Sequence, residues 1–177
     1  MEYTGQGGER RPELDGATYV DCGNKPALTP TAAISCTCWL QVASFTKTYE
    51  TILAKGDDSY RLGRGGGGTG DALHFAISGA NNFDGTTVVT DNEWHFVAGT
   101  YDGTTATLYV DGKVDTARAF AAGLTASTYK LFIGENAQAT GRQLTGVLDD
   151  VRIYGRGLSA GEVASLAGIT KPMHKPF

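Results

Sequence analysis

Two Asp-Gly pairs, nine residues apart, constrain the fold of this chain more than any other feature. They are Asp102-Gly103 and Asp111-Gly112 in the run WHFVAGTYDGTTATLYVDG, and each follows aromatic and β-branched residues. Asp-Gly favours the two-residue hairpin turn in which both central residues have positive φ. The spacing therefore predicts three antiparallel strands over 93–101, 104–110 and 113–120, and it assigns both aspartates to turns, not to catalysis.

Short strand-like runs continue along the rest of the chain. The 25 glycines are scattered between apolar runs, as expected where tight turns join many strands. This pattern predicts an all-β fold, an antiparallel β-sandwich. The expected strands are Thr18–Cys22, Ala33–Val42, Glu50–Lys55, Ser59–Gly63, Ala72–Ser78, Glu93–Tyr101, Ala106–Val110, Lys113–Phe120, Lys130–Gly134 and Gly146–Tyr154.

A helix signal occurs near the end of the chain. Ser159 stands three residues before Glu162, which is the spacing of a capping box, and Val163 and Leu166 follow at helical spacing. We expect one short C-terminal helix of one or two turns.

Length and charge limit the class of protein. A chain of 177 residues with 41% hydrophobic residues fits one globular domain, which we place at 12–168, with an N-terminal extension at 1–11 and a linker or tail at 169–177. A net charge of −4 argues against a nucleic-acid partner. No apolar run reaches the roughly 18 residues of a membrane span, so we expect no membrane insertion by this domain.

The three cysteines leave two possibilities open. Cys36 and Cys38 are two apart in a predicted strand, so their side chains share a face. Three buried, reduced thiols are the favoured interpretation, because free cysteine is among the most buried residue types. A single bridge from Cys22 to Cys36 or Cys38 is the alternative.

Five segments together resemble one family. The segments are LDGATYVDCGN, AISCTCWLQV, TILAKGDDSYRLG, EWHFVAGTYDGTTATLYVDGKV and GVLDDVRIYGRGLS. They are similar to LamG-like jelly-roll domains of the concanavalin A-like lectin/glucanase group, over residues 12–168. The resemblance implies a jelly roll of two curved sheets with the first and last strands side by side. It also implies a module of a larger extracytoplasmic bacterial protein, secreted, periplasmic or at the cell surface.

The residues give no sign of an enzyme. Glucanases of this fold group carry a Glu-x-Asp-x-x-Glu strand, and the nearest match, Glu13-Leu14-Asp15, lacks the last glutamate. The glycine-rich run 63–68 lies between two predicted strands, whereas a dinucleotide site needs a strand followed by a helix. A hydrolase would have only Asp57, Asp58 and Asp71 as loop carboxylates. We therefore expect a non-catalytic binding module.

The resemblance also implies a structural calcium ion that joins the first strand to the last. The matching carboxylates are Asp15, Asp149 and Asp150, and Ca²⁺ prefers such oxygen ligands. Strict alternation would put Leu148 and Asp150 on one face and Asp149 and Val151 on the other. The alternative to calcium is an ion pair with Arg152 or Arg118.

A carbohydrate surface needs an aromatic platform and polar side chains that reach hydroxyls. Trp39 and Trp94 are expected in the core, and Tyr60 and His74 have the alternative interpretation of packed strand residues. The expected partner is a glycan or a cell-surface protein, and a protein-interaction or spacer domain is the alternative function. The candidate ligand-binding residues are Tyr60, Arg61, Arg64, His74, Asn136 and Arg142, with Asn81 and Asn82 nearby in sequence.

Overall fold

The computed structural model describes residues 13–65, 70–120 and 123–169. The predictions made for residues 1–11 and 170–177, and for the centre of the glycine-rich run, lie outside these residues.

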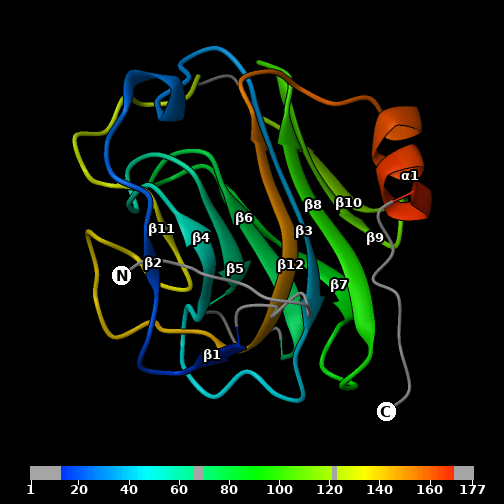
Figure 1. Cartoon of the computed structure of the whole chain (residues 1–177). Coiled ribbons are helices and arrows are strands. Elements are labelled where there is room, and N and C mark those ends of the chain that lie inside the picture. The colour runs from blue at the N-terminus through cyan, green and yellow to red at the C-terminus, as the bar shows by residue number, and fades with distance from the viewer. Residues whose placement is uncertain (1–12, 66–69, 121–122, 170–177) are drawn as a thin grey trace.

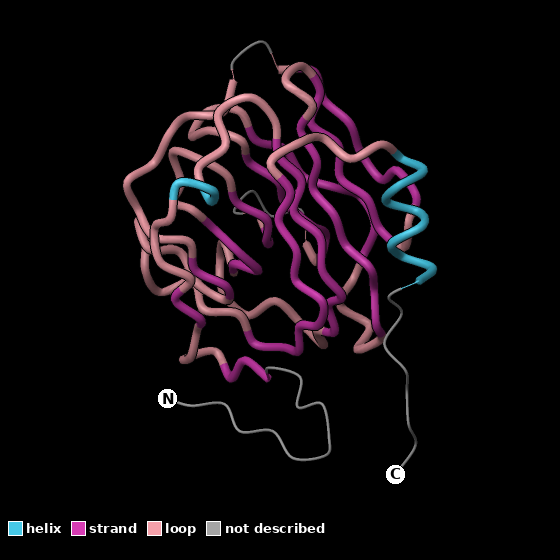
Figure 2. The backbone as a smooth tube through the Cα atoms, turned by 45° about the horizontal axis from the view of Figure 1, so that its top comes forward, coloured by secondary structure: helices cyan, strands magenta, loops and turns pink. Residues whose placement is uncertain are grey.

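Two antiparallel six-stranded sheets stack on each other (Figures 1 and 2). This arrangement confirms the predicted antiparallel β-sandwich. In order across the first sheet, the strands are β1 (Glu13–Asp15), β12 (Thr145–Tyr154), β3 (Ile34–Gln41), β8 (Trp94–Tyr101), β9 (Thr105–Val110) and β10 (Lys113–Ala119). Across the second sheet they are β2 (Val20–Asp21), β11 (Phe132–Ile133), β4 (Thr51–Ala54), β5 (Arg61–Arg64), β6 (Ala72–Ala76) and β7 (Asn82–Val88).

The two ends of the sandwich sequence meet at one edge of the first sheet. Strand β1 pairs antiparallel with β12, and Leu14 lies opposite Gly146. The Leu14 side chain is 4% exposed and joins the main core. The first and last strands are therefore neighbours, as the family resemblance implies.

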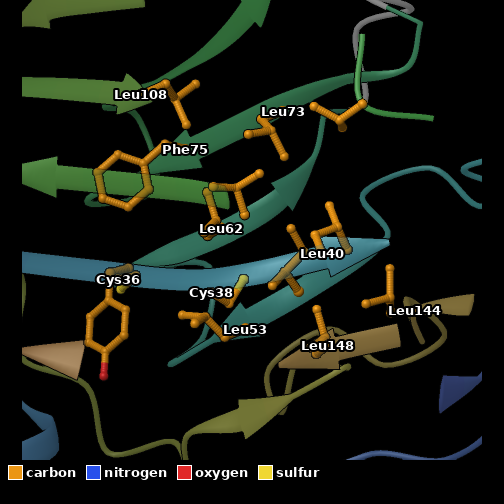
Figure 3. Packing of buried hydrophobic residues seen from close by; sticks show 14 of the residues in the cluster. Cys36, Cys38, Leu40, Leu53, Leu62, Leu73, Phe75, Leu108, Leu144 and Leu148 are labelled. Atoms are coloured by element: carbon orange, nitrogen blue, oxygen red, sulfur yellow. The ribbon is translucent and has the colours of Figure 1, made fainter. Parts of the chain in front are cut away.

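The core lies between the sheets and follows the two-residue alternation of each strand. On β3, Cys36, Cys38 and Leu40 point towards the second sheet, where Leu62 and Phe75 meet them (Figure 3). All three cysteines are free, with Cys36 and Cys38 buried and Cys22 half-buried. Burial raises the pKa of the Cys36 and Cys38 thiols, so both stay protonated. The reduced interpretation is confirmed, although Cys22 is not fully buried.

Helix α1 (Ala160–Ile169) covers the other face of the first sheet (Figure 1). Val163 packs there on Trp39, Phe96 and Tyr109, which form a second apolar cluster. The capping box is confirmed: Ser159 N–H donates to Glu162 Oε2 at 2.8 Å, and Glu162 N–H donates to Ser159 Oγ at 3.3 Å. The helix is longer than the predicted one or two turns, because packing on this cluster extends it. No helix among the described residues is long and apolar enough to cross a membrane.

The hairpin prediction is confirmed at one Asp-Gly pair and corrected at the other. Asp111 and Gly112 have φ of 51° and 77°, as the predicted turn requires. At the first pair only Gly103 has positive φ, at 104°. Asp102 stays outside the turn and accepts hydrogen bonds from the Thr104 and Thr105 amides at 2.8 Å.

Strand β7 was not predicted, because Asp84-Gly85 within it resembles a turn. Asp84 lies opposite His74 in the sheet, and a bulge follows it. A Cβ at residue 85 would lie 2.1 Å from Asp115 Oδ2 of β10, so a glycine is required there. The strand therefore accommodates Asp-Gly, because Asp84 contacts His74 and the missing side chain of Gly85 leaves room for Asp115. A short 3₁₀ helix, η1 (Pro26–Leu28), completes the described elements.

Candidate functional site

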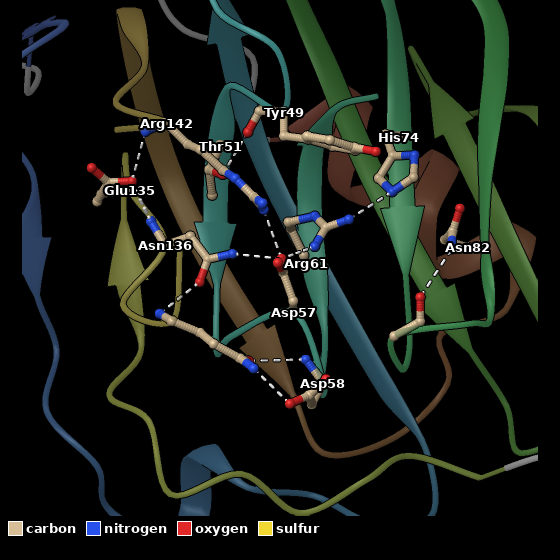
Figure 4. A network of polar contacts seen from close by, with 12 residues as sticks. Tyr49, Thr51, Asp57, Asp58, Arg61, His74, Asn82, Glu135, Asn136 and Arg142 are labelled. Atoms are coloured by element: carbon tan, nitrogen blue, oxygen red, sulfur yellow. Dashed lines mark hydrogen bonds and ion pairs between the residues drawn. The ribbon is translucent and has the colours of Figure 1, made fainter. Parts of the chain in front are cut away.

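The outer face of the second sheet carries buried polar side chains. On β5 and β6, Leu62 and Phe75 face the core, so their neighbours Arg61 and His74 face away from it. Arg61 is nevertheless only 7% exposed and His74 only 3% exposed. Figure 4 shows these side chains on the strands in front of β3 and β12. Polar groups at this depth need partners, and both guanidinium Nη atoms of Arg61 and both ring nitrogens of His74 have one.

A line of contacts crosses three strands. Arg61 Nη2 lies 3.0 Å from His74 Nε2, and His74 Nδ1 lies 2.7 Å from Asp84 Oδ1. A guanidinium can only donate, so Nε2 accepts from Arg61 and we assign the ring proton to Nδ1, which donates to Asp84. This pattern describes a neutral imidazole.

The electrostatics of His74 agree with a neutral ring. Burial lowers the pKa of His74, and the nearby charge of Arg61 lowers it further. The hydrogen bond to Asp84 acts in the opposite direction but is outweighed. At neutral pH His74 is therefore an uncharged link between Arg61 and Asp84.

Asp57 is the centre of a second set of contacts (Figure 4). Its Oδ1 accepts from Arg61 Nη1, from Arg142 Nη1 at 2.7 Å and from Asn136 Nδ2 at 2.8 Å. Burial alone would raise the pKa of the Asp57 carboxyl, but the hydrogen bond from Arg142 and the charge of Arg61 hold it below its usual range. Asp57 is therefore a carboxylate held between two guanidinium groups.

Tyr49 lies over both arginines. Its ring centroid is 4.7 Å from Arg142 Cζ and 5.4 Å from Arg61 Cζ, and it meets the His74 ring edge-on at 6.2 Å. Its backbone has φ of 59°, which is uncommon for a bulky residue. Such left-handed residues persist only where the surroundings impose them. We call the set Tyr49, Asp57, Arg61, His74, Asp84, Asn136 and Arg142 the outer-face network.

A buried carboxylate shapes the loop that follows β11. Glu135 is 1% exposed, and it accepts from the amides of Asn136, Gly141 and Arg142 at 2.8, 3.1 and 3.0 Å. These bonds fold residues 135–142 into a fixed loop that directs Asn136 and Arg142 towards Asp57. The charge pattern of the sequence did not reveal this role of Glu135.

The structure brings together four of the six residues predicted to bind a ligand: Arg61, His74, Asn136 and Arg142. Arg64 is not part of this group: it pairs with the core residue Leu73 in the sheet, and its side chain donates to the carbonyl oxygens of Lys47 and Gly70. The sequence missed Tyr49 and Asp84, and it considered Asp57 only as a loop carboxylate in a turn; Asp57 does lie in the turn between β4 and β5.

Tyr60 is a correction to the predicted set. Its side chain has no exposed surface, and its hydroxyl donates to Leu28 O at 2.9 Å. Because β5 alternates, Tyr60 shares the core face with Leu62 and cannot reach a ligand. Asn81 and Asn82 are bound within the β6–β7 turn, where their side-chain amides donate to Ser78 Oγ and Gly79 O.

The predicted calcium ligands lie at different places along the β1–β12 edge. Asp15 lies opposite Thr145, where it accepts from the Ala17 and Thr18 amides, whereas Asp149 lies opposite Trp39. Among the described residues, no three acidic, histidine or cysteine side chains gather as a metal site would require. The calcium ion therefore stays a prediction.

Strict alternation around Asp150 is wrong. A bulge follows Asp149, and Asp150 has φ of 48°. This extra residue lets both Leu148 and Val151 pack on the core. Asp150 pairs with Arg152 at 2.7 Å, which is the ion pair expected as the alternative to calcium.

Two of the surface hollows lie outside the network. One, of about 410 Å³, lies beside the Asp57–Asp58 turn and is lined by Asp58, Gly79 and residues 125–129. The other, of about 460 Å³, lies along the β1–β12 edge near Asp15.

Comparison with known families gives one match. The family model described as the concanavalin A-like lectin/glucanases superfamily matches residues 14–164. A search of curated protein sequences found no match.

Solved structures with the same fold include several that are described as sugar-binding. A Bacteroides ovatus protein described as a candidate carbohydrate-binding protein is 20% identical, with a TM-score of 0.68; the alignment covers 83% of this chain and 43% of that one. A second similar structure is domain 4 of AbnA, a GH43 extracellular arabinanase from Geobacillus stearothermophilus, in complex with arabinotriose. It is 17% identical with a TM-score of 0.71, and the alignment covers 88% of this chain and 75% of that one. The CBM40 of Ruminococcus gnavus IT-sialidase, bound to α2,3-sialyllactose, is 14% identical with a TM-score of 0.69. That alignment covers 90% of this chain and 96% of the CBM40.

The chain thus spans less than half of the Bacteroides ovatus protein. At these identities the likeness concerns the fold.

Proposed function

Because the chain belongs to the concanavalin A-like lectin/glucanases superfamily, we propose that it is a non-catalytic carbohydrate-binding module. The observation that carries the proposal is the outer-face network, in which an aromatic ring and several fixed polar groups converge on one sheet face. Sugar sites need these two components, a flat apolar surface and oriented hydrogen-bonding groups. The similar folds that are described as holding arabinotriose and sialyllactose support the same interpretation.

Three partly exposed side chains form the accessible rim of the network. The side chains of Asp57 and Asp84 are 30% and 26% exposed, and that of Arg142 is 18% exposed. Each is already held by a neighbour, so a ligand would meet donors and acceptors that need no reordering. Such preorganisation lowers the entropic cost of binding. The rim presents both signs of charge, which suits the alternating donor and acceptor character of sugar hydroxyls.

Two neighbouring carboxylates, Asp57 of the network and Asp58, are already engaged as hydrogen-bond acceptors, whereas glycoside hydrolysis requires a pair with different roles. A hydrolase needs two carboxyl groups across a cleft, one of them protonated near neutral pH. Asp57 is instead kept ionised by Arg142 and Arg61. Asp58 accepts from Gln138 Nε2 at 2.6 Å, and its backbone N–H is also bound to that side chain. The candidate carboxylates therefore act as hydrogen-bond acceptors in this proposal.

The setting that we propose is an extracytoplasmic one, within a larger bacterial protein. Support comes from one of the similar folds, which is described as a domain of an extracellular arabinanase. The partner would be a glycan, free or carried on a cell-surface protein. A protein-interaction or spacer domain without a sugar ligand is the alternative.

A glycan array tests the proposal. The full chain is screened against plant, algal and bacterial polysaccharides, with calcium and with chelator, beside an Arg142→Gln variant. We expect saturable binding to a related group of glycans and a weaker signal from the variant, which loses its charged contact with Asp57. Silence from the folded wild-type chain in both conditions would favour the protein-interaction alternative.

A further inference from the structure

The hollow of about 410 Å³ beside the network is lined by two groups of residues that are far apart in the sequence. Asp58 and Gly79 form one wall, and residues 125–129 form the other. Its volume falls within the roughly 300–1,000 Å³ of small-molecule sites. We name it the Tyr129 hollow, because the Tyr129 side chain is the large aromatic group in its lining.

A buried lysine fixes the wall that carries Tyr129. Lys55 has no exposed surface, and its Nζ donates to Tyr129 O at 2.7 Å and also to Asn24 Oδ1. Asn24 in turn donates through Nδ2 to Thr128 O at 2.8 Å. A fully buried ammonium is costly unless its donors are used, so this contact strongly favours one position of the segment. The backbone beneath the Tyr129 ring is therefore held in place.

The other wall is held from the loop of the outer-face network. Gln138 Nε2 donates to Asp58 Oδ2 at 2.6 Å, and Asp58 N–H donates to Gln138 Oε1 at 3.1 Å. Gln138 N–H is bound to Asn136 Oδ1 at 3.0 Å. Both walls of the hollow are thus preformed, which favours a rigid ligand of matching size.

The lining selects a class of ligand. Tyr129 is 41% exposed, so part of this aromatic side chain is accessible to solvent. Asp58 is the carboxylate of the lining, and the lining residues include no lysine, arginine or histidine. A fixed carboxylate accepts from neighbouring sugar hydroxyls, whereas it repels the carboxylate of a uronic or sialic acid.

We infer that the Tyr129 hollow binds one neutral sugar ring, stacked on Tyr129 and hydrogen-bonded by Asp58. The inference rests on the proposed carbohydrate-binding function and adds the position and charge class of the ligand. Asp57 belongs to the network and Asp58 to the hollow, so a single turn joins the two surfaces. An oligosaccharide with one ring in the hollow would extend from there towards Tyr49 and Arg142.

Backbone amide chemical shifts of the full chain provide the test. The probes are neutral trisaccharides (arabinotriose, xylotriose and cellotriose) and two acidic ones, trigalacturonate and α2,3-sialyllactose, each at millimolar concentration. We expect a neutral probe to shift the amides of Asp58, Gly79 and residues 125–129 saturably. Tyr129→Ala should weaken its binding about tenfold, whereas Tyr129→Phe, which keeps the ring, should stay within about twofold of wild type.

The charge of the hollow gives a second readout. Asp58→Asn should weaken the neutral probe and reduce the discrimination against trigalacturonate. Neutral binding that shifts only the network amides, or that tolerates Tyr129→Ala, would overturn the inference and leave the proposed function standing. Acidic probes that bind in the hollow as well as neutral ones would also overturn it. No saturable shift with any probe would count against the proposed function itself.

Discussion

Arg61 shows how this chain keeps a charge beneath its surface. The guanidinium is nearly buried, yet Asp57 lies on one side of it, His74 accepts from it, and the Tyr49 ring covers it. Its Nε has no protein partner in the structure. Each neighbour thus offsets part of the desolvation cost of the charge. Loss of one neighbour should therefore change the energetic contribution of the other contacts to Arg61.

Asp57→Ala should destabilise the fold. It removes the acceptor shared by two guanidinium groups, and breaking a buried ion pair typically costs more than breaking an exposed one. Because the Asp57 side chain is 30% exposed, we expect a discounted loss of about 1–3 kcal/mol in urea unfolding. Asp21→Ala is the control, since it breaks the exposed pair with Lys130 at 2.7 Å. Equal effects of the two variants would contradict the buried role of Asp57.

Two histidines should give stability changes in different pH windows. The pKa of His74 is lowered, mainly by burial, so its contribution is complete above the unfolded value of 6.5 and is lost as pH falls below it. At His95 burial also lowers the pKa, but hydrogen bonds to Asp111 and Asp91 outweigh this and raise it. The His95 contribution is therefore present below 6.5 and is lost as pH rises through the raised value.

Urea unfolding of His74→Gln and His95→Gln across this range checks both signs. We expect His74→Gln to flatten the loss of stability on the acid side and His95→Gln to flatten the loss on the alkaline side. If His74→Gln changed stability on the alkaline side, or His95→Gln on the acid side, the contacts assigned to that histidine would be wrong.

Part of the outer-face network could be read from the sequence at this scale. Arg61 and His74 alternate with Leu62 and Phe75, so their common outward direction follows from strand period alone. The same alternation should have placed Tyr60 in the core beside Leu62. Tyr49 was not predictable, because its position depends on a left-handed backbone in a loop and on contacts with residues far along the chain.

At the scale of elements, Asp115 closes one edge of the sandwich. From β10 of the first sheet it accepts from the Thr86 and Thr87 amides at 3.0 and 3.1 Å and from both hydroxyls, all on β7 of the second sheet. Burial would raise the pKa of Asp115, but these bonds together hold it below its usual range. Strands β7 and β10 belong to different sheets and do not pair through backbone hydrogen bonds. The Asp115 carboxylate connects them instead.

Asp115→Ala should open this edge. Hydrogen bonds to a charged group are worth about 1.5–3 kcal/mol, so we expect a loss near 2 kcal/mol and faster amide exchange at Thr86 and Thr87. Amides in the centre of β3 should keep their protection at matched stability. Unchanged exchange at the two threonines would show that β7 does not depend on Asp115.

Helix α1 should depend on its capping box. Ser159→Ala removes the acceptor of the Glu162 amide, and loss of such a cap costs about 1 kcal/mol. Trp39 fluorescence reports the event, because Trp39 lies in the cluster beneath the helix. The hydrogen bond from Arg156 lowers the pKa of Glu162 to about 2. The capping contribution should therefore be complete above the ordinary glutamate pKa of 4.5 and fade as pH falls towards 2.

Ser159→Asn is the matched control, since asparagine also caps helices and should retain most of the stability. A Ser159→Ala variant with unchanged Trp39 emission and stability would mean that packing alone holds the helix.

Element prediction succeeded where a local signal had no competitor. The hairpin of β9 and β10 follows from Asp111-Gly112, because both residues adopt the left-handed backbone that this pair favours. Strand β7 was not predicted, because the conformation of Asp84-Gly85 depends on contacts with His74 and Asp115, which lie outside the segment. The predicted side-chain directions around Asp150 were wrong for a similar reason, since strict alternation cannot show where an extra residue is inserted.

At the scale of the whole molecule, the sandwich gives each sheet a different outer face. Helix α1 covers that of the first sheet, and the outer-face network occupies that of the second. Turns and alternation predicted the antiparallel sandwich, and the family resemblance implied that its first and last strands lie side by side. The sequence did not predict which outer face would carry the network, because this depends on where the loops before β4 and after β11 fold.

The calcium prediction belongs to this scale, because the ion would join the first strand to the last. Melting temperature is measured in excess calcium and in excess chelator, with Asp15→Asn as the ligand variant. The prediction requires a higher melting temperature in calcium that the variant loses. Equal melting temperatures in the two conditions would contradict it.

The central claim is that the network side of the second sheet holds a glycan. The most direct measurement is calorimetric titration of a glycan selected on the array into wild type, Tyr49→Ala and Tyr154→Ala, the last a tyrosine truncation on the first sheet. We predict saturable binding by wild type, a loss of about tenfold in affinity for Tyr49→Ala, and affinity within about twofold of wild type for Tyr154→Ala. Binding that is unchanged in Tyr49→Ala but lost in Tyr154→Ala would place the ligand on the other sheet and contradict the account.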